Sequence, residues 1–108
     1  MRRIILFTLA SALWAQSPNA KNGQRLFEIK ACYQCHGWQG QGGLAGPRLA
    51  QTKLNLQGFV AILRNPPPSQ MPPYRATVLT DAEAADLFAF IQSIPAPPPV
   101  DTIPLLKN

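Results

Sequence analysis

The stretch Cys32-Tyr33-Gln34-Cys35-His36 decides how this 108-residue chain is interpreted. Two thiols three positions apart, at the end of a helix, can reach the two vinyl groups on one edge of a haem and form thioethers. The residue after the second thiol then lies under the iron, where an imidazole supplies an axial ligand. The motif therefore predicts one covalently attached haem c, bound through Cys32 and Cys35, with His36 on the iron.

A disulfide, a thioredoxin-like redox pair and half of a zinc site are the alternative uses of the two cysteines. Zinc would need two further ligands, yet His36 is the only histidine and no third cysteine exists. A thioredoxin-like pair would lie beside a βαβ pattern, and no segment shows sustained strand-type alternation. A bare disulfide suits an oxidising compartment but leaves His36 and the long loops unexplained.

The first fifteen residues differ from the rest of the chain. Two arginines precede an apolar run over residues 4–14, and small side chains surround its end. This pattern is typical of a secretory signal peptide, so we predict a signal over 1–15, cut after Ala15 or alternatively Ala12, and a periplasmic protein. The run is shorter than the roughly 20 residues of a membrane-spanning helix, and an uncleaved anchor that keeps the protein at the membrane is the alternative.

Charge and size limit the remaining possibilities. The formal net charge of +5 becomes +3 without the two arginines of the signal, and two haem propionates would remove most of that. We therefore expect no nucleic-acid partner and no transmembrane segment after cleavage. A domain this small builds a modest core and usually needs a disulfide, a metal or a cofactor to stabilise it.

Three helices are predicted from apolar periodicity and cap residues. The first covers residues 20–31 behind Asn19, the second covers 54–64, and the third starts at Thr80 and ends before Pro95. Glycine-rich and proline-rich loops separate them, with no sheet. Loops this long in so small a domain indicate that they enclose something.

The predicted domain boundaries follow from these elements. A single domain is expected over residues 16–94, followed by an extended, lightly attached proline-rich tail over 95–108. Gly23 stands inside the first helix, where glycine costs about 1 kcal/mol relative to alanine. Close approach of another helix would compensate for that cost.

Together with the Cys32–His36 motif, two further segments resemble the class I cytochrome c family. Gly23-x-x-x-Phe27 and Leu87-x-x-Phe90-Ile91 are similar to the helices that cross near the haem in that family, with Phe90 where tyrosine is common. The resemblance covers nearly all of the sequence after the signal. It implies an all-α small cytochrome c fold, with three to four helices and long loops around one haem.

The resemblance also implies roles for residues on both sides of the iron. Gly46-Pro47-x-Leu49 is similar to the family segment whose proline carbonyl accepts a hydrogen bond from the histidine Nδ1–H, so Pro47 would orient His36. Met71-Pro72-Pro73-Tyr74 is similar to the family's methionine loop. After export Met71 is the only methionine left, and its sulfur is the predicted second axial ligand. In the alternative, Met71 only fills core and the iron stays five-coordinate or binds water or lysine.

Three further side chains are candidates for contact with the haem, and each also has a purely structural interpretation. Arg48 follows the Gly-Pro step and would either pair with a haem propionate or lie on the surface as an ordinary arginine. Tyr74 would pack or donate a hydrogen bond at the haem edge, or belong to ordinary packing. Trp38 would shield the haem or cover a surface patch.

The proline triplets form a rigid loop and a spacer, with a ligand for a proline-binding module as the alternative.

The predicted function is that of a monohaem electron carrier. Ligation by His36 and Met71 fills both axial positions, and no nucleophile has a free base beside it, so we predict no enzyme activity. A dehydrogenase, an oxidase or another cytochrome is the expected partner of a monomeric carrier or complex subunit in a respiratory chain. The alternatives are an open-site haem protein with ligand-binding or peroxidase-type activity, and a haem-free disulfide-bearing binding protein.

Overall fold

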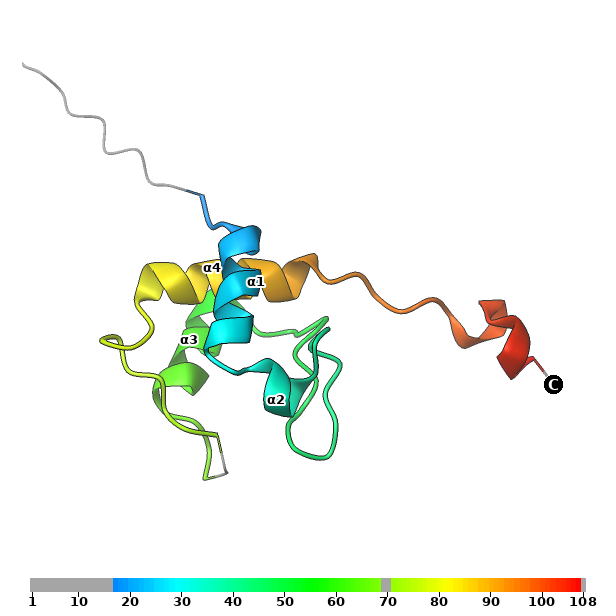
Figure 1. The fold of residues 1–108 in the computed structure, drawn as a ribbon, viewed down its shortest axis with the longest axis horizontal. Coiled ribbons are helices and arrows are strands. Elements are labelled where there is room, and N and C mark those ends of the chain that lie inside the picture. The colour runs from blue at the N-terminus through cyan, green and yellow to red at the C-terminus, as the bar shows by residue number, and fades with distance from the viewer. Residues whose placement is uncertain (1–16, 69–70, 108) are drawn as a thin grey trace, which may run out of the picture.

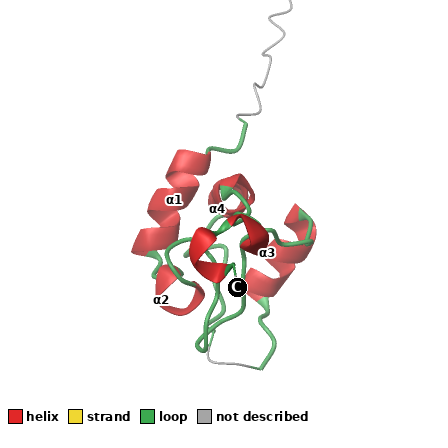
Figure 2. Ribbon diagram, turned by 90° about the vertical axis from the view of Figure 1, so that its right-hand side faces the viewer, coloured by secondary structure: helices red, strands yellow, loops and turns green. Residues whose placement is uncertain are grey.

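The computed structural model describes residues 17–68 and 71–107. In these ranges the chain forms four α-helices and two 3₁₀ turns, and no strand (Figures 1 and 2). The helices are α1 (Ala20–Ile29), α2 (Tyr33–His36), α3 (Leu56–Arg64) and α4 (Asp81–Ser93), and the turns are η1 (Val100–Thr102) and η2 (Pro104–Leu106). The predicted all-α fold with three to four helices is confirmed.

Each of the three longer helices begins behind a side chain that caps it. The side-chain oxygens of Asn19, Asn55 and Thr80 accept hydrogen bonds from the backbone N–H three residues further on, at 3.1, 2.8 and 3.2 Å. Such a cap satisfies one of the N–H groups that lack a partner in the first turn. The caps at Asn19 and Thr80 agree with the prediction, whereas the predicted start of the second helix, at residue 54, is wrong. That helix starts at Leu56 because Asn55 is extended and serves as its cap.

The first helix ends at Ile29, two residues before the predicted end. Ala31 adopts a left-handed backbone with φ of 62°. Its N–H donates to the carbonyl of Glu28 at 3.0 Å, and the N–H of Cys32 donates to that of Phe27 at 3.1 Å. This is a Schellman ending, which reverses the chain direction and is usually built with glycine. The turn delivers Cys32 directly from the end of α1 to the start of α2.

The core lies where α1, α3 and α4 meet. Figure 1 shows α1 crossing α4, with α3 behind the crossing. The buried side chains of this core come from the three longer helices and from the segment before α4. They are Leu26, Phe27, Phe59, Leu63, Leu79, Ala84, Leu87, Phe88 and Ile91.

Gly23 lets α1 and α4 approach closely enough for their backbones to touch. A Cβ at position 23 would overlap the carbonyl oxygen of Asp86 and would lie only 2.8 Å from the Cβ of Phe90. The rings of Phe27 and Phe90 pack one turn further on, with centroids 5.3 Å apart and planes tilted by 60°. The predicted close approach at Gly23 and the crossing of the two family segments are therefore confirmed.

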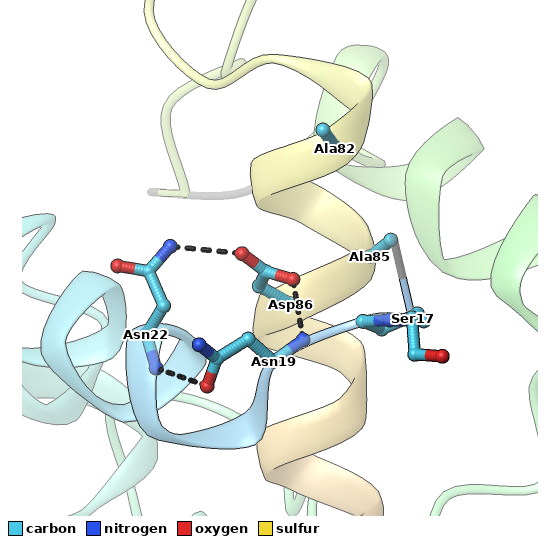
Figure 3. A pocket seen from close by; sticks show the side chains of 7 residues that line it. Ser17, Asn19, Asn22, Ala82, Ala85 and Asp86 are labelled. Atoms are coloured by element: carbon cyan, nitrogen blue, oxygen red, sulfur yellow. Dashed lines mark hydrogen bonds between the residues drawn. The ribbon is translucent and has the colours of Figure 1, made fainter. Parts of the chain in front are cut away.

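Asp86 stabilises the same crossing through hydrogen bonds. One of its carboxylate oxygens accepts the N–H of Asn19 at 2.6 Å, and the other accepts Nδ2 of Asn22 at 2.8 Å (Figure 3). Acidic side chains are favourable at a helix N-terminus, where N–H groups lack partners. A carboxylate of α4 therefore helps to hold the start of α1.

The tail differs from the extended segment that was predicted. It leaves α4 and runs away from the helices (Figure 1), but it folds into η1 and η2 instead of staying extended throughout. Proline at position 104 suits such a turn because it stands at the first helical position, where its missing N–H needs no partner. The predicted signal peptide, residues 1–15, lies outside the described residues. Among the described helices, none combines the length and apolar character needed to cross a bilayer.

Replacement of Gly23 by alanine tests the crossing. The added methyl group would force α1 and α4 apart, and overpacking of this kind costs about 1–3 kcal/mol. We expect Gly23→Ala to lower the free energy of unfolding of the haem-loaded protein by about 2 kcal/mol, measured by guanidinium denaturation.

Gly58 in α3 provides the matched control. A Cβ there would meet only side-chain atoms, the nearest 3.3 Å away at Oδ1 of Asn55. Gly58→Ala should leave the stability unchanged or raise it by up to about 1 kcal/mol through helix propensity. Equal losses in the two variants would contradict a specific backbone contact at Gly23.

Candidate haem site

The two cysteines lie at either end of one short turn of helix. Cys32 precedes α2 and is partly buried, whereas Cys35 lies within α2 and is exposed. Their sulfurs are not joined in a disulfide. Gly37 ends α2 with a positive φ of 80° and sends the chain into the glycine-rich loop.

His36 is the one buried polar side chain among the described residues, with 7% of its surface exposed. Its Nδ1 lies 2.7 Å from the carbonyl oxygen of Pro47. A carbonyl oxygen can only accept, so Nδ1 carries the proton and donates it to Pro47. The other ring nitrogen, Nε2, is then unprotonated and presents its lone pair, which is the form of histidine that binds a metal. The contact that the resemblance implied between His36 and Pro47 is present.

The glycine-rich loop reaches this position through its own backbone hydrogen bonds. Gly42 N–H donates to the carbonyl of His36 at 2.8 Å, and the N–H groups of Leu49 and Ala50 both donate to that of Gly40, at 2.8 and 2.9 Å. At Gly46 a Cβ would lie 3.2 Å from Cε1 of His36 and 3.0 Å from the carbonyl oxygen of Cys35. The loop therefore packs directly on the histidine ring, and glycine at position 46 makes room for it.

The segment that carries Met71 is attached at Tyr74. The N–H of Tyr74 donates to the carbonyl of Leu63 at 2.7 Å, its hydroxyl donates to that of Lys30 at 3.0 Å, and its own carbonyl accepts Nη1 of Arg64 at 2.7 Å. Three hydrogen bonds thus connect Tyr74 to α3 and to the end of α1. Met71, three residues earlier, is half-buried and packs against the same core as Cys32 and Tyr74.

Burial also affects the acidity of two groups in this region. It raises the pKa of the Cys32 thiol to about 11. Burial is likewise the main reason why the pKa of Tyr74 is raised, with smaller contributions from negative charge on Cys32 and Cys35. Thioether sulfurs cannot ionise, so only burial would act on Tyr74 once both cysteines are bonded to haem. In either case the Tyr74 hydroxyl keeps its proton at neutral pH and donates it to the Lys30 carbonyl.

Arg48 and Trp38 have partners of their own within the protein. Arg48 donates through Nε to the carbonyl of Ala50 at 3.2 Å and bonds Gln51 through Nε and Nη2. Gln51 in turn donates to the carbonyl of Ile94 at 3.0 Å, beyond the end of α4. Trp38 stacks on Tyr33 and is otherwise exposed. The contact of Arg48 with a propionate, and a haem-shielding role for Trp38 or Tyr74, stay predictions.

Two hollows among the described residues lie outside the Cys32–His36 motif. One, of about 430 Å³, lies on α3 and is lined by Leu56, Gln57, Val60, Ala61 and Asp81. The other, a pocket of about 360 Å³, lies beside the start of α1, lined by Ser17, Pro18, Asn19, Asn22, Ala82, Ala85 and Asp86 (Figure 3). Both oxygens of Asp86 are already used by Asn19 and Asn22. Ten helical residues separate this pocket from the end of α1 that leads to Cys32, a distance of about 15 Å. Within residues 17–68 and 71–107, no three His, Cys, Asp or Glu side chains could together hold a metal ion.

The residues around His36 fit a covalently bound haem. Two unpaired thiols stand at the required spacing, a buried imidazole presents its Nε2 lone pair, and the residue after the second thiol is that imidazole. Partly buried hydrophobic side chains that could contact a haem pack against the core: Tyr33, Leu49, Val60, Met71, Tyr74 and Phe90. An all-α fold with this attachment site defines a c-type cytochrome.

Comparisons with known proteins identify the family. The sequence model of the family described as "Cytochrome C oxidase, cbb3-type, subunit III" matches residues 18–91. No curated protein matches the chain. The crystal structure of cytochrome cL from the marine methylotrophic bacterium Methylophaga aminisulfidivorans MPT is similar, with a TM-score of 0.56 and 29% sequence identity. The match covers 68% of this chain and 51% of that one, so the chain spans about half the length of cytochrome cL.

The chain belongs to the family of c-type cytochrome domains described as subunit III of cbb3-type cytochrome c oxidase. The resemblance to monohaem c-type cytochromes is confirmed, and with it the cofactor, one covalently attached haem c; Cys32 and Cys35 are consistent with its attachment motif. The Asn55 cap and the Tyr74 contacts are the functional details that the sequence interpretation missed. Asn55 had a recognisable signal, an asparagine before an apolar run, whereas the Tyr74 contacts use backbone carbonyls that leave no trace in the sequence.

Replacement of Arg64 tests whether it holds the Met71 segment. Its guanidinium bonds the Tyr74 carbonyl and also forms an ion pair with Asp81 at 2.6 Å, in which the Arg64 side chain is 19% exposed and Asp81 84%. We expect Arg64→Gln to lower the free energy of unfolding by about 2 kcal/mol, the usual contribution of a hydrogen bond to a charged donor. Guanidinium denaturation of the haem-loaded protein measures the loss.

The matched control is Asp81→Asn, which removes the ion pair and leaves the bond to Tyr74. Exposed ion pairs contribute about 0–1 kcal/mol, so this change should be small. If Asp81→Asn destabilises the protein as much as Arg64→Gln, the surface ion pair is the important interaction and the role of the Tyr74 carbonyl is wrong.

Proposed function

We propose that this protein is a one-electron carrier whose iron is held between Nε2 of His36 and the sulfur of Met71. The observation that supports it most directly is the 2.7 Å contact between Nδ1 of His36 and the Pro47 carbonyl oxygen. That hydrogen bond selects the tautomer with a free Nε2 and fixes the plane of the ring. When bound, the haem supplies an iron that alternates between Fe(III) and Fe(II), and a methionine ligand favours the reduced state.

The protein contributes rigidity on both sides of the haem. Pro47 holds the His36 ring through a bond from a loop that is itself closed by backbone hydrogen bonds. On the other side, Tyr74 and Arg64 tether the segment that carries Met71, and Pro72 and Pro73 restrict it before folding. With His36 and Met71 both bound to it, the iron would have no position open to a substrate. This arrangement suits electron transfer through the haem edge and disfavours catalysis at the iron.

The partner of such a carrier is another redox protein. The matched family is described as a subunit of cbb3-type cytochrome c oxidase, and the similar structure is a cytochrome cL from a methylotroph. We propose that this chain exchanges electrons with an oxidase, a dehydrogenase or another cytochrome in a respiratory chain, as a free monomer or as a subunit. The signal-like residues 1–15 support a periplasmic location. Brief docking through a small interface is usual for electron-transfer pairs.

The Met71→Ala variant tests the ligand set by optical spectroscopy. Protein exported from a strain that matures c-type cytochromes should carry covalent haem, with sharp reduced bands and, when oxidised, the weak far-red band of an iron–thioether bond. The variant should lose that band and bind carbon monoxide, and its reduction potential should fall by on the order of 0.1 V.

Tyr74→Phe is the control, because it removes a hydroxyl from the same segment and keeps Met71. It should retain the far-red band and exclude carbon monoxide. A wild-type protein that lacks the band and binds carbon monoxide would instead support an open-site haem protein with ligand-binding or peroxidase-type activity. Colourless protein would refute the haem assignment itself.

A further inference from the structure

The Trp38 side chain is held rigidly although it is exposed. Its indole has 58% of its surface in solvent, yet it stacks on the ring of Tyr33 with centroids 3.8 Å apart and planes 17° from parallel. Tyr33 stands between the two attachment cysteines and packs against the core. An exposed tryptophan that has already lost its side-chain freedom is well suited to contact another protein, because little further entropy is lost on docking.

A second apolar side chain projects from the same loop. Leu44 is fully exposed, at the tip of a turn closed by the hydrogen bond from Gly43 N–H to the carbonyl of Gly46, 2.9 Å long. The segment that carries Trp38 and Leu44, residues 37–46, is called the Trp38 loop below. It starts directly after His36, and its backbone bonds to Gly40 and His36 hold it in shape. The loop thus presents two large exposed apolar side chains, of which Trp38 stacks on Tyr33 in the attachment motif.

The charge distribution indicates what kind of surface fits this loop. From Ala31 to Pro47 the chain has no acidic or basic side chain apart from the buried His36, in a protein with ten lysines and arginines. The cations on either side are engaged elsewhere, since Lys30 donates to the carbonyl of Val78 at 2.8 Å and Arg48 bonds Gln51. A charged partner face would lose hydration here without gaining a counter-charge. The complementary surface is therefore apolar and uncharged.

We propose that the Trp38 loop is the docking surface for a protein redox partner that presents an apolar, uncharged face, an inference that rests on the proposed electron-carrier function. Tyr33 holds the Trp38 ring in place for that contact. Docking here brings the partner next to α2, the helix that contains Cys35 and that the loop directly follows. One electron then passes from the reduced centre to the oxidised one, with no bond formed or broken and no proton moved.

Electron self-exchange between two copies of the protein tests the docking surface, because each copy offers the other an apolar, uncharged loop. The rate is measured from NMR line broadening in mixtures of the ferrous and ferric forms. Loss of a buried apolar side chain at a small interface weakens it substantially, so Trp38→Ser and Leu44→Ser should each slow exchange roughly tenfold. Trp38→Phe, which keeps an aromatic ring over Tyr33, should retain most of the rate.

Leu105→Ser is the matched control for Leu44→Ser, because Leu105 is 95% exposed but lies in η2, outside the helical domain. It should leave the rate within twofold. A readout without electron transfer is the dilution series of the reduced protein, followed by ¹⁵N NMR. The indole N–H of Trp38 and the amide of Leu44 should shift with protein concentration, while the amide of Leu105 should not.

Three results would overturn the inference. Unchanged self-exchange in Trp38→Ser and Leu44→Ser would place docking elsewhere while leaving the carrier function intact. An equal loss in Leu105→Ser would indicate general surface stickiness. Loss of the far-red band or a changed reduction potential in Trp38→Ser would show that Trp38 covers the haem instead of docking a partner. Failure of the carrier function itself is distinguishable, because the wild-type protein would then show no measurable exchange.

Discussion

The contact between the backbones of α1 and α4 at Gly23 is the constraint on which the rest of the structure depends. Because no side chain separates the helices there, Phe27 and Phe90 can pack one turn further on, and Asp86 can reach the N-terminus of α1. The crossing determines where α1 ends in space. Since the Schellman turn follows immediately, it also determines where Cys32 and the attachment helix α2 begin.

Around the haem site, main-chain atoms do much of the positioning. Pro47 orients His36 with a carbonyl, Lys30 receives the Tyr74 hydroxyl with a carbonyl, and Tyr74 receives Arg64 in the same way. Glycine and proline both help these backbone contacts to form. Glycine permits close approach of the backbone, and proline reduces the conformational entropy that is lost on folding. A domain with so small a core can therefore hold both the His36 ring and the segment that carries Met71 in place. The covalent cofactor then adds the apolar surface that the chain itself lacks.

The two faces of the attachment motif have different tasks. Inward, Cys32 and His36 lie partly or fully buried against the core and the loop that carries Pro47. Outward, Tyr33 supports the exposed ring of Trp38. The five consecutive positions from Cys32 to His36 thus connect the cofactor to a rigid apolar surface. The uncharged stretch around them determines which kind of partner surface can pack there.

The sequence by itself determined the cofactor, the helical class and most helix ends, because thiol spacing, cap residues and prolines act over a few neighbouring positions. Asn19 and Thr80 are recognisable as helix caps and Pro95 as a helix end from the local sequence. Gly23 indicates that another helix packs closely, but the sequence does not show which helix it is. Only the tertiary structure decided that Asp86 holds α1, that Tyr74 bonds Lys30 and that Trp38 lies on Tyr33. It also placed the left-handed turn at Ala31, where an alanine gives no sign of it. The physical reason is that these partners are far apart in the chain or are backbone atoms common to every residue, so packing alone brings them together.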